Sequence, residues 1–139
     1  MKPAAPPLPD TRGSARPYWA ATLRDELQLP FCDACRGAIF YPRDFCPSCG
    51  GRAVTWRRCS GRGTVYSYSV IHTHPDPAFK QRLPYTVALV TLEEGARLMT
   101  EIVDCPPESV RVGMAVAVKF RRVSEDAALP VFAPAGART

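Results

Sequence analysis

Apolar and polar residues alternate with a period of two along much of the chain after residue 59, as β-strands require. Five segments carry this alternation or a continuous apolar run: residues 64–71, 85–92, 97–103, 114–121 and 129–133. The segment at 85–92 is apolar on both faces, which is typical of a strand buried on both sides. A Glu-Glu-Gly turn ending at Gly95 predicts a hairpin between the second and third strands. Five short strands predict a small closed barrel of the OB type over residues 59–134.

A helical period replaces this alternation near the N-terminus. Four apolar residues follow Pro17 at helical spacing: Tyr18, Trp19, Leu23 and Leu27. Proline is well placed in the first turn of a helix, so we predict a helix over residues 17–29 that ends before Pro30. Such a short helix is unstable alone in water and must pack either on the rest of the chain or on a partner. Because exposed apolar stripes mark interfaces, we expect Trp19, Leu23 and Leu27 to contact a partner protein.

The two ends of the chain are expected to lack regular structure. Residues 1–16 are predicted to be a disordered leader, because the first 13 hold four of the 15 prolines and few large apolar groups. Residues 135–139 are predicted to be a short tail. The N-terminus lacks the apolar core of a secretory signal, and no stretch approaches the roughly 20 apolar residues of a membrane span. We therefore expect a cytoplasmic protein with reduced cysteines and no membrane insertion.

Two Cys-x-x-Cys pairs, Cys32 with Cys35 and Cys46 with Cys49, are separated by ten residues. Each pair turns the backbone so that two thiolates face one point, and together they complete a tetrahedral shell that suits Zn²⁺ best and iron second. Gly37 follows the first pair and Gly50 follows the second, where the tight turn needs positive φ. Two disulfides are the alternative, but no secretory signal precedes the pairs.

These cysteines predict a rubredoxin-like zinc ribbon over residues 30–58. A closed shell of four sulfurs has no open coordination position, so this metal would hold the fold and would not activate water. The expected architecture is therefore mainly β: a short N-terminal helix, the zinc ribbon and a five-stranded OB-fold barrel.

The net charge of +5 comes from 18 basic and 13 acidic residues, and most of the basic residues are arginine. This balance is explained either by a GC-rich coding sequence or by binding to phosphate, on nucleic acid or on a nucleotide cofactor. Zinc ribbons and OB barrels both commonly bind polynucleotides, so a single-stranded nucleic-acid-binding module is an alternative function. Against it, Tyr66 and Tyr68 lie on a strand without Lys or Arg between residues 64 and 71.

The remaining reactive side chains do not form a recognisable catalytic set. Cys59 follows two arginines, which could lower the pKa of its thiol, and Cys105 precedes two prolines. His72 and His74 share one face if their segment is extended, where they could bind metal or act as a base. No Ser-His-Asp set, phosphate-binding glycine loop or paired-carboxylate motif accompanies them. We therefore predict no catalytic residues and no activity of the chain on its own.

A series of short motifs in a fixed order resembles one known family over about residues 17–134. The matching pieces follow the N-terminal helix and first Cys-x-x-Cys in this order: Phe40-Tyr41-Pro42-Arg43, Cys46 to Gly51, Gly61 to Val70, Pro77-Ala78-Phe79, Leu83-Pro84-Tyr85, Leu92 to Gly95, and Val112 to Val116. They resemble the zinc-ribbon/OB-fold family once catalogued as domain of unknown function thirty-five. Its members accompany thiolases, ketoacyl-type acyltransferases and lipid-transfer-protein-like aldolases of steroid side-chain degradation as small non-catalytic subunits.

The resemblance implies an accessory subunit that stabilises a thiolase-like acyl-CoA enzyme and shares its acyl-CoA. A heterotetramer is expected, because thiolase-fold enzymes are usually dimers and each protomer could carry one copy. The loop of residues 72–84 joins the first two barrel strands, a place where OB folds often bind ligands. Within it we expect Lys80 and Arg82 to meet the CoA phosphates and Phe79 to line the acyl or pantetheine portion.

Overall fold

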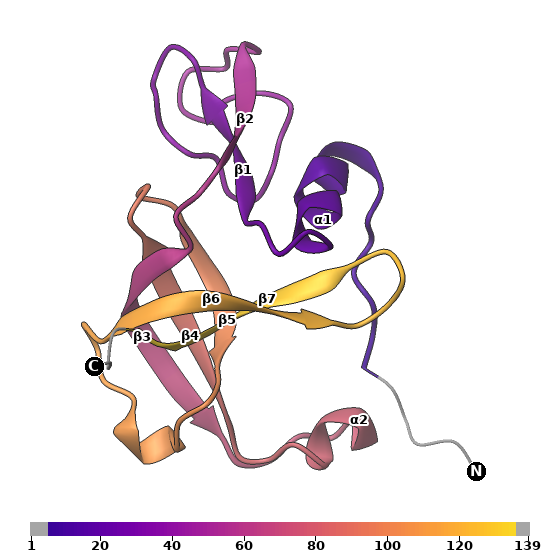
Figure 1. Cartoon of the computed structure of the whole chain (residues 1–139), viewed down its shortest axis with the longest axis vertical. Helices are drawn as coiled ribbons and strands as arrows, with labels where there is room; N and C mark the ends of the chain where they lie inside the picture. Colours follow the sequence, from indigo (N-terminus) through magenta and orange to yellow (C-terminus); the bar gives the residue numbers. More distant parts are fainter. Residues whose placement is uncertain (1–5, 136–139) are drawn as a thin grey trace.

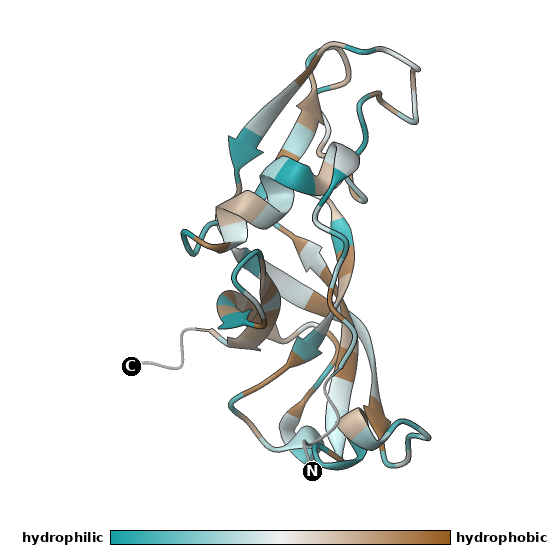
Figure 2. Ribbon diagram, turned by 90° about the vertical axis from the view of Figure 1, so that its right-hand side faces the viewer, coloured by the Kyte–Doolittle hydropathy of each residue, from teal (hydrophilic) through white to brown (hydrophobic). Residues whose placement is uncertain are grey.

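The computed structural model describes residues 6–135, which form an elongated molecule with a small ribbon at one end and a barrel at the other (Figures 1 and 2). The N-terminal elements are the 3-10 helix η1 (Gly13–Ala15), helix α1 (Arg16–Thr22), and the antiparallel ribbon strands β1 (Gln28–Cys32) and β2 (Val54–Arg58). Residues 1–5 of the predicted leader and 136–139 of the predicted tail lie outside the described residues. The prediction of a disordered leader is wrong at its end, because Gly13–Ala15 form η1 and Arg16 begins α1. No helix within residues 6–135 is long and apolar enough to cross a membrane.

Five strands form the barrel: β3 (Arg62–Ile71), β4 (Tyr85–Leu92), β5 (Arg97–Ile102), β6 (Ala115–Arg122) and β7 (Ala128–Pro134). They close in the order β3-β4-β5-β7-β6, with β6 pairing back onto β3. Neighbouring strands are antiparallel except for β5 and β7, which are parallel. Helix α2 (Pro77–Lys80) lies between β3 and β4, and the 3-10 helix η2 (Pro107–Ser109) lies between β5 and β6. This arrangement confirms the predicted mainly β architecture with a five-stranded OB barrel.

Strand β4 shows how the alternation of residues builds the barrel. Its even-numbered residues, Thr86, Ala88, Val90 and Leu92, point inward and are buried. The residues between them are only half-buried, and they include Val87 and Leu89. The expectation that this strand is buried on both faces is therefore wrong for this chain alone. A closed barrel of five strands covers the inner face of each strand and leaves the outer face to solvent or to other contacts.

Helix α1 ends at Thr22, well before the predicted residue 29. Asp25 adopts φ 58°, a left-handed conformation that ends the helix and that aspartate tolerates better than most residues. The Thr22 hydroxyl donates to the Trp19 carbonyl oxygen at 2.6 Å and accepts from the Ala128 amide at 3.1 Å, which fixes the helix end on β7. Leu27 therefore follows the helix, and its side chain is 2% exposed.

One apolar core joins the N-terminal elements to the barrel. Tyr18, Leu27, Leu29 and Phe31 belong to the same buried cluster as Phe132 of the barrel. The ribbon has only a small cluster of its own, made of Cys32, Ile39 and Cys46 with Val54 packed against it. A core of this size gives little stability by itself, so a metal ion bound by the four cysteines would add a constraint to the packing on the shared core.

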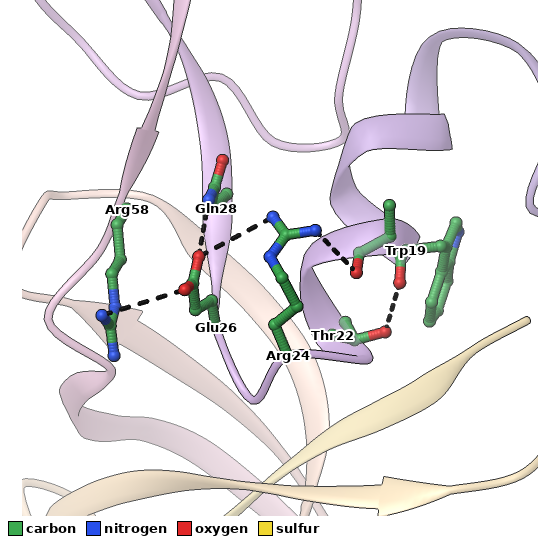
Figure 3. Close-up of polar contacts among 7 residues, drawn as sticks. Trp19, Thr22, Arg24, Glu26, Gln28 and Arg58 are labelled. Carbon is green, nitrogen blue, oxygen red and sulfur yellow. Dashed lines mark hydrogen bonds and ion pairs between the residues drawn. The ribbon is translucent and has the colours of Figure 1, made fainter.

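Polar contacts fix the approach of helix α1 to the ribbon (Figure 3). The Glu26 carboxylate accepts from the Gln28 side-chain amide at 2.8 Å and lies 3.8 Å from the Arg24 guanidinium and 4.0 Å from that of Arg58. Glu26 thus connects the end of the helix to both ribbon strands. Exposed pairs of this kind contribute little stability individually, so they orient the segment more than they hold it.

Residues 59–61 connect the ribbon to the barrel through closely packed backbone. Gly61 has φ 81°, and a Cβ at this position would lie 2.6 Å from Cγ1 of Val118. The amide of Ser60 donates to the Glu94 carboxylate at 2.8 Å, so the β4–β5 turn holds the linker from the other side. These contacts fix the ribbon relative to the barrel and define the space between them.

Candidate metal centre and binding groove

Four cysteine sulfurs converge within the ribbon. The Sγ atoms of Cys32, Cys35, Cys46 and Cys49 all lie within 4.8 Å of one another. Those of Cys32 and Cys49 are 3.7 Å apart, and those of Cys35 and Cys46 are 3.9 Å apart. A Zn–S bond of about 2.3 Å gives a regular tetrahedron with edges of about 3.8 Å, so the sulfurs already fit a zinc ion. The four predicted ligands are therefore brought together, and a tetrahedral ion would use all four of these sulfurs.

The two Cys-x-x-Cys turns have the same backbone design. The Arg36 amide donates to the Cys32 carbonyl oxygen and the Gly50 amide donates to that of Cys46, both at 2.7 Å. Arg36 has φ 67° and Gly50 has φ 76°, so each turn places one residue in the left-handed region. The prediction that Gly37 supplies the positive φ of the first turn is wrong, because Arg36 holds that conformation. Arg36 carries a strain that Gly50 avoids.

Hydrogen bonds shift the pKa values of two of the four thiols in opposite directions. Backbone amides of Cys49 and Ser48 lower the pKa of the Cys46 thiol to about 7 by stabilising its thiolate. Hydrogen bonds with the sulfurs of Cys49, Cys32 and Cys46 raise the pKa of the Cys35 thiol to about 12. A divalent cation at the centre would stabilise all four thiolates, and the closed sulfur shell makes its role structural.

A groove of about 520 Å³ runs over the outer face of the barrel, where helix α1 and the ribbon meet it. Helix α1, the ribbon loop after β1, the segment at α2, and strands β4 to β7 all contribute to its walls. Large apolar side chains dominate the lining: Trp19, Phe40, Tyr41, Phe79, Tyr85 and Met99. Tyr41 and Met99 are each 63% exposed although they are among the largest side chains present. An exposed apolar surface of this extent is typical of a binding site.

Three charged residues form a cluster in the wall of this groove. The guanidinium groups of Arg82 and Arg121 both contact Oε1 of Glu101, and the distance from Arg121 Nη1 is 3.1 Å. Arg82 also lies over the ring of Tyr85, 5.5 Å from its centroid. The Glu101 side chain is 18% exposed, and those of Arg82 and Arg121 are 31% and 35% exposed. Two cations share one carboxylate, so the cluster carries a net charge of +1.

Comparison with known proteins supports both domains. The chain matches the family described as "ChsH2, rubredoxin-like zinc ribbon domain" over residues 19–55 and the family described as "ChsH2, C-terminal OB-fold domain" over residues 56–121. It is 44% identical over 97 residues to a "DUF35 domain-containing scaffold protein" of Methanocaldococcus jannaschii, which covers 68% of this chain and 67% of the relative. The chain belongs to the DUF35 family. Its four clustered cysteines all lie within the segment that matches the zinc ribbon, which supports a structural zinc ion there.

Two further relatives of this DUF35 chain have names that refer to enzymes. A "Probable enoyl-CoA hydratase alpha subunit" of Thermomonospora curvata is 38% identical over 118 residues, which are 85% of this chain but only 36% of that relative. The solved structure "Ltp2-ChsH2(DUF35) aldolase" contains a chain with 36% identity and a TM-score of 0.81. The match covers 92% of this chain and 99% of that chain. The DUF35 fold is therefore shared over nearly the whole length.

The residues predicted to lie near acyl-CoA do not all lie in the groove. Phe79 and Arg82 line the groove, whereas Lys80 is exposed at the end of α2. Asp76 caps α2 by accepting from the Ala78 amide at 2.8 Å, so part of the predicted loop is helical. The Arg82 guanidinium is engaged with Glu101, which leaves Lys80 as the more available of the two cations.

The three residues predicted to form a partner interface also differ in exposure. Trp19 and Leu23 are half-buried, and both line a second cavity of about 480 Å³ between helix α1 and Asp126 of the β6–β7 turn. Trp19 lines the larger groove as well, so its indole lies between the two hollows. Leu27 is buried in the core and cannot contact a partner. The prediction for Leu27 is wrong, because the helix ends before it.

Of the other reactive residues, Cys59 is buried in the core, His74 is hydrogen-bonded within its loop, and His72 is exposed. Cys59 is 5% exposed, and burial followed by the nearby Glu94 carboxylate raises the pKa of its thiol to about 12. The idea that its basic neighbours lower this pKa is wrong, because the thiol points into the core. Nδ1 of His74 accepts from the Asp76 amide at 3.0 Å and its ring stacks on Phe79, whereas His72 is exposed. No His, Asp or Glu in the described part of the chain joins a group suited to a metal ion.

Sequence reasoning missed the groove residues that come from distant strands. Glu101 and Arg121 are 20 positions apart, and β7 lies between their strands in the sheet order. Their proximity follows only from the closed barrel. The sequence of β4 nevertheless indicated an outer apolar surface. Both faces of this strand are apolar, but the barrel buries only the inner one.

Proposed function

We propose that this chain is a non-catalytic accessory subunit of a thiolase-like enzyme that acts on acyl-CoA. The observation that carries this proposal is the large apolar groove, which offers a binding surface on a chain whose Cys59 thiol is buried and whose four clustered cysteines converge on one point. The names of the relatives are consistent with it, since they describe a scaffold protein, a hydratase subunit and an aldolase with a DUF35 chain. In this proposal the partner supplies the nucleophile and base, as thiolases, acyltransferases and aldolases require.

The partner contact in this proposal includes Trp19 and Leu23. Trp19 lies edge-on to Tyr18, with ring centroids 4.9 Å apart, and so its ring is already oriented before any partner binds. Half-buried tryptophans of this kind often dominate interface energies because little side-chain entropy is lost on binding. Two such chains on a dimeric thiolase-fold enzyme would give a heterotetramer.

The acyl-CoA contact in this proposal involves the segment around α2. Lys80 would meet a CoA phosphate, and Phe79 would line the acyl or pantetheine portion. Arg82 would assist from the groove wall, where Glu101 limits its freedom. Lys80→Ala alone should raise the KM of the assembled enzyme for acyl-CoA, and adding Arg82→Ala should raise it further, both measured with the partner in excess so that every chain is in the complex. An unchanged KM would remove these residues from the substrate path.

The central test is to compare the chain alone with the chain plus its partner. We expect the purified chain to show no carbon–carbon bond formation or cleavage with any acyl-CoA, and co-expression with the neighbouring genes to yield a complex through a tag on this chain. Trp19→Ala should weaken that complex, while Val112→Ala, which alters a side chain 67% exposed outside both hollows, should not. Robust turnover by the isolated chain, lost in Cys59→Ala or His72→Ala, would contradict the proposal.

Single-stranded nucleic-acid binding has less support from the barrel surface. The Arg97 guanidinium lies 3.5 Å from the centroid of the Tyr66 ring and covers one face of it. A base would have to displace this contact before it could stack. We expect no salt-dependent affinity for single-stranded oligonucleotides.

A further inference from the structure

The charge cluster in the groove restricts what can cover it. Arg82 and Arg121 contact the same oxygen of Glu101, so one carboxylate serves two guanidinium groups. Each guanidinium has five N–H donors, and the contacts with Glu101 use few of them. The three side chains are 18–35% exposed, so water currently solvates the excess positive charge. Anything that seals the groove removes this water.

Sealing the groove with a purely apolar surface would be unfavourable. It would bury an uncompensated +1 charge, and leaving one charge unpaired in an interface commonly costs several kcal/mol. A carboxylate placed between Arg82 and Arg121 would complete a cluster of two cations and two anions. Arginine matches a carboxylate with two parallel hydrogen bonds, which adds direction to the attraction.

The surroundings of the cluster favour a protein occupant. Trp, Tyr, Phe, Met and Arg are the side chains enriched at protein–protein interfaces, and the groove presents all five types. The apolar surface also continues beyond the groove: Met99 pairs across the sheet with Leu89, which is half-buried on the outer face of β4. A protein segment could contact this apolar residue beside the groove, whereas a small molecule would need only the groove.

We propose that the groove receives a segment of the partner enzyme in which an aspartate or glutamate is flanked by apolar side chains, and that this carboxylate binds between Arg82 and Arg121. This inference rests on the proposed function for the existence of a partner. It adds which surface of the chain is bound and which chemistry the partner must present there. The apolar flanks of the segment pack on Trp19, Tyr41 and Met99, and Phe79, which α2 contributes to the groove lining, is left to acyl-CoA.

The test measures the dissociation constant between this chain and the partner enzyme that co-purifies through a tag on this chain, at several salt concentrations. Arg121→Gln removes one cation and should weaken binding by about tenfold or more, with a smaller dependence on salt. Arg82→Gln should act in the same direction from a different element of the fold. Arg122→Gln, the same change at the next residue of β6 and outside the groove lining, should leave affinity within about twofold.

Glu101→Gln distinguishes recognition from simple support of the fold. It raises the charge of the cluster from +1 to +2, so an incoming carboxylate should bind at least as tightly as before. If the cluster only supports the local structure, Glu101→Gln and Arg121→Gln should weaken the complex equally. That outcome, or an affinity unchanged in both arginine variants with normal melting curves, would overturn the inference.

A measurement on the unaltered chain guards against misfolded variants. Hydroxyl-radical labelling of Met99 and Tyr41, each 63% exposed, should fall strongly in the complex. Undiminished labelling in a stable complex would show that the partner binds elsewhere, and would leave the proposed function intact. Absence of any complex with the wild-type chain would overturn both proposals.

Two other occupants give distinct results. If a second copy of this chain fills the groove, the chain alone should form a dimer that Arg121→Glu disrupts. If acyl-CoA itself fills it, the isolated chain should bind acyl-CoA and lose that binding in Arg121→Gln. Either result would overturn the assignment to a partner segment.

Discussion

The paired cysteine turns allow a test in which three substitutions in these turns are predicted to change the free energy of unfolding differently. Arg36 and Gly50 occupy equivalent places in the two turns, with φ values of 67° and 76°. Gly37 lies outside the left-handed region, and an added Cβ would meet nothing within 4 Å at Gly37 or at Gly50. Steric differences are therefore removed, and only the backbone preference remains.

The magnitudes follow from two opposing terms. A left-handed conformation costs a residue with a Cβ about 1–2 kcal/mol, while replacing glycine lowers the entropy of the unfolded chain and stabilises by about 0.4–1 kcal/mol. Arg36→Gly should therefore raise the free energy of unfolding by about 0.5–1 kcal/mol, and Gly50→Ala should lower it by a similar amount. Gly37→Ala should be neutral to stabilising, by up to about 1 kcal/mol.

The assay is denaturant unfolding of the zinc-loaded chain, with zinc retention checked by chelator competition. A change of 1 kcal/mol corresponds to a few degrees in melting temperature for a domain of this size, which is readily measured. The reasoning would be refuted if Gly50→Ala and Gly37→Ala changed stability with the same sign, or if Arg36→Gly were destabilising. Either result would mean that the two turns are not equivalent in the folded protein.

Three further predictions concern the metal, the linker and a buried thiol. Cys32→Ser should lose the metal and leave the chain insoluble or unable to join its complex; far less than one zinc per intact wild-type chain in elemental analysis would contradict the site. Gly61→Ala should destabilise by more than about 2 kcal/mol, because it adds a clash with Val118 to the left-handed strain. Gly113→Ala, at φ 88° in open space, is its control and should show the strain alone. The folded pKa of Cys59 is about 12 and its ordinary value is 9.0, so the thiol of the unfolded chain loses its proton first as the pH rises. The contribution of this thiol to the free energy of unfolding should therefore be complete below about pH 9 and fall above it. Cys59→Ala should flatten that decline when unfolding is measured as a function of pH.

Short-range patterns determined what the sequence could predict. The period of two, interrupted by turns, placed the barrel strands close to their observed bounds, since each strand depends on its own alternation. The spacing of the cysteines predicted the metal site because two turns of fixed geometry need no knowledge of the rest of the fold. Leu27 was misplaced because its helical spacing from Leu23 is real, yet Asp25 ends the helix between them. The Glu101–Arg121 contact could not be predicted, because it depends on how the barrel closes.

The one wrong expectation about β4 bears on the proposed interface. The inner residues of the strand fill the barrel, and its outer residues Val87 and Leu89 are apolar but only half-buried. Solvent alone would favour polar residues there, as it does on the outer face of most antiparallel strands. The sequence pattern of a strand buried on both faces therefore describes β4 correctly only if a second surface lies against it. Val87 lines the groove and Leu89 pairs with Met99, so a partner segment in the groove would cover the positions that the isolated barrel leaves open.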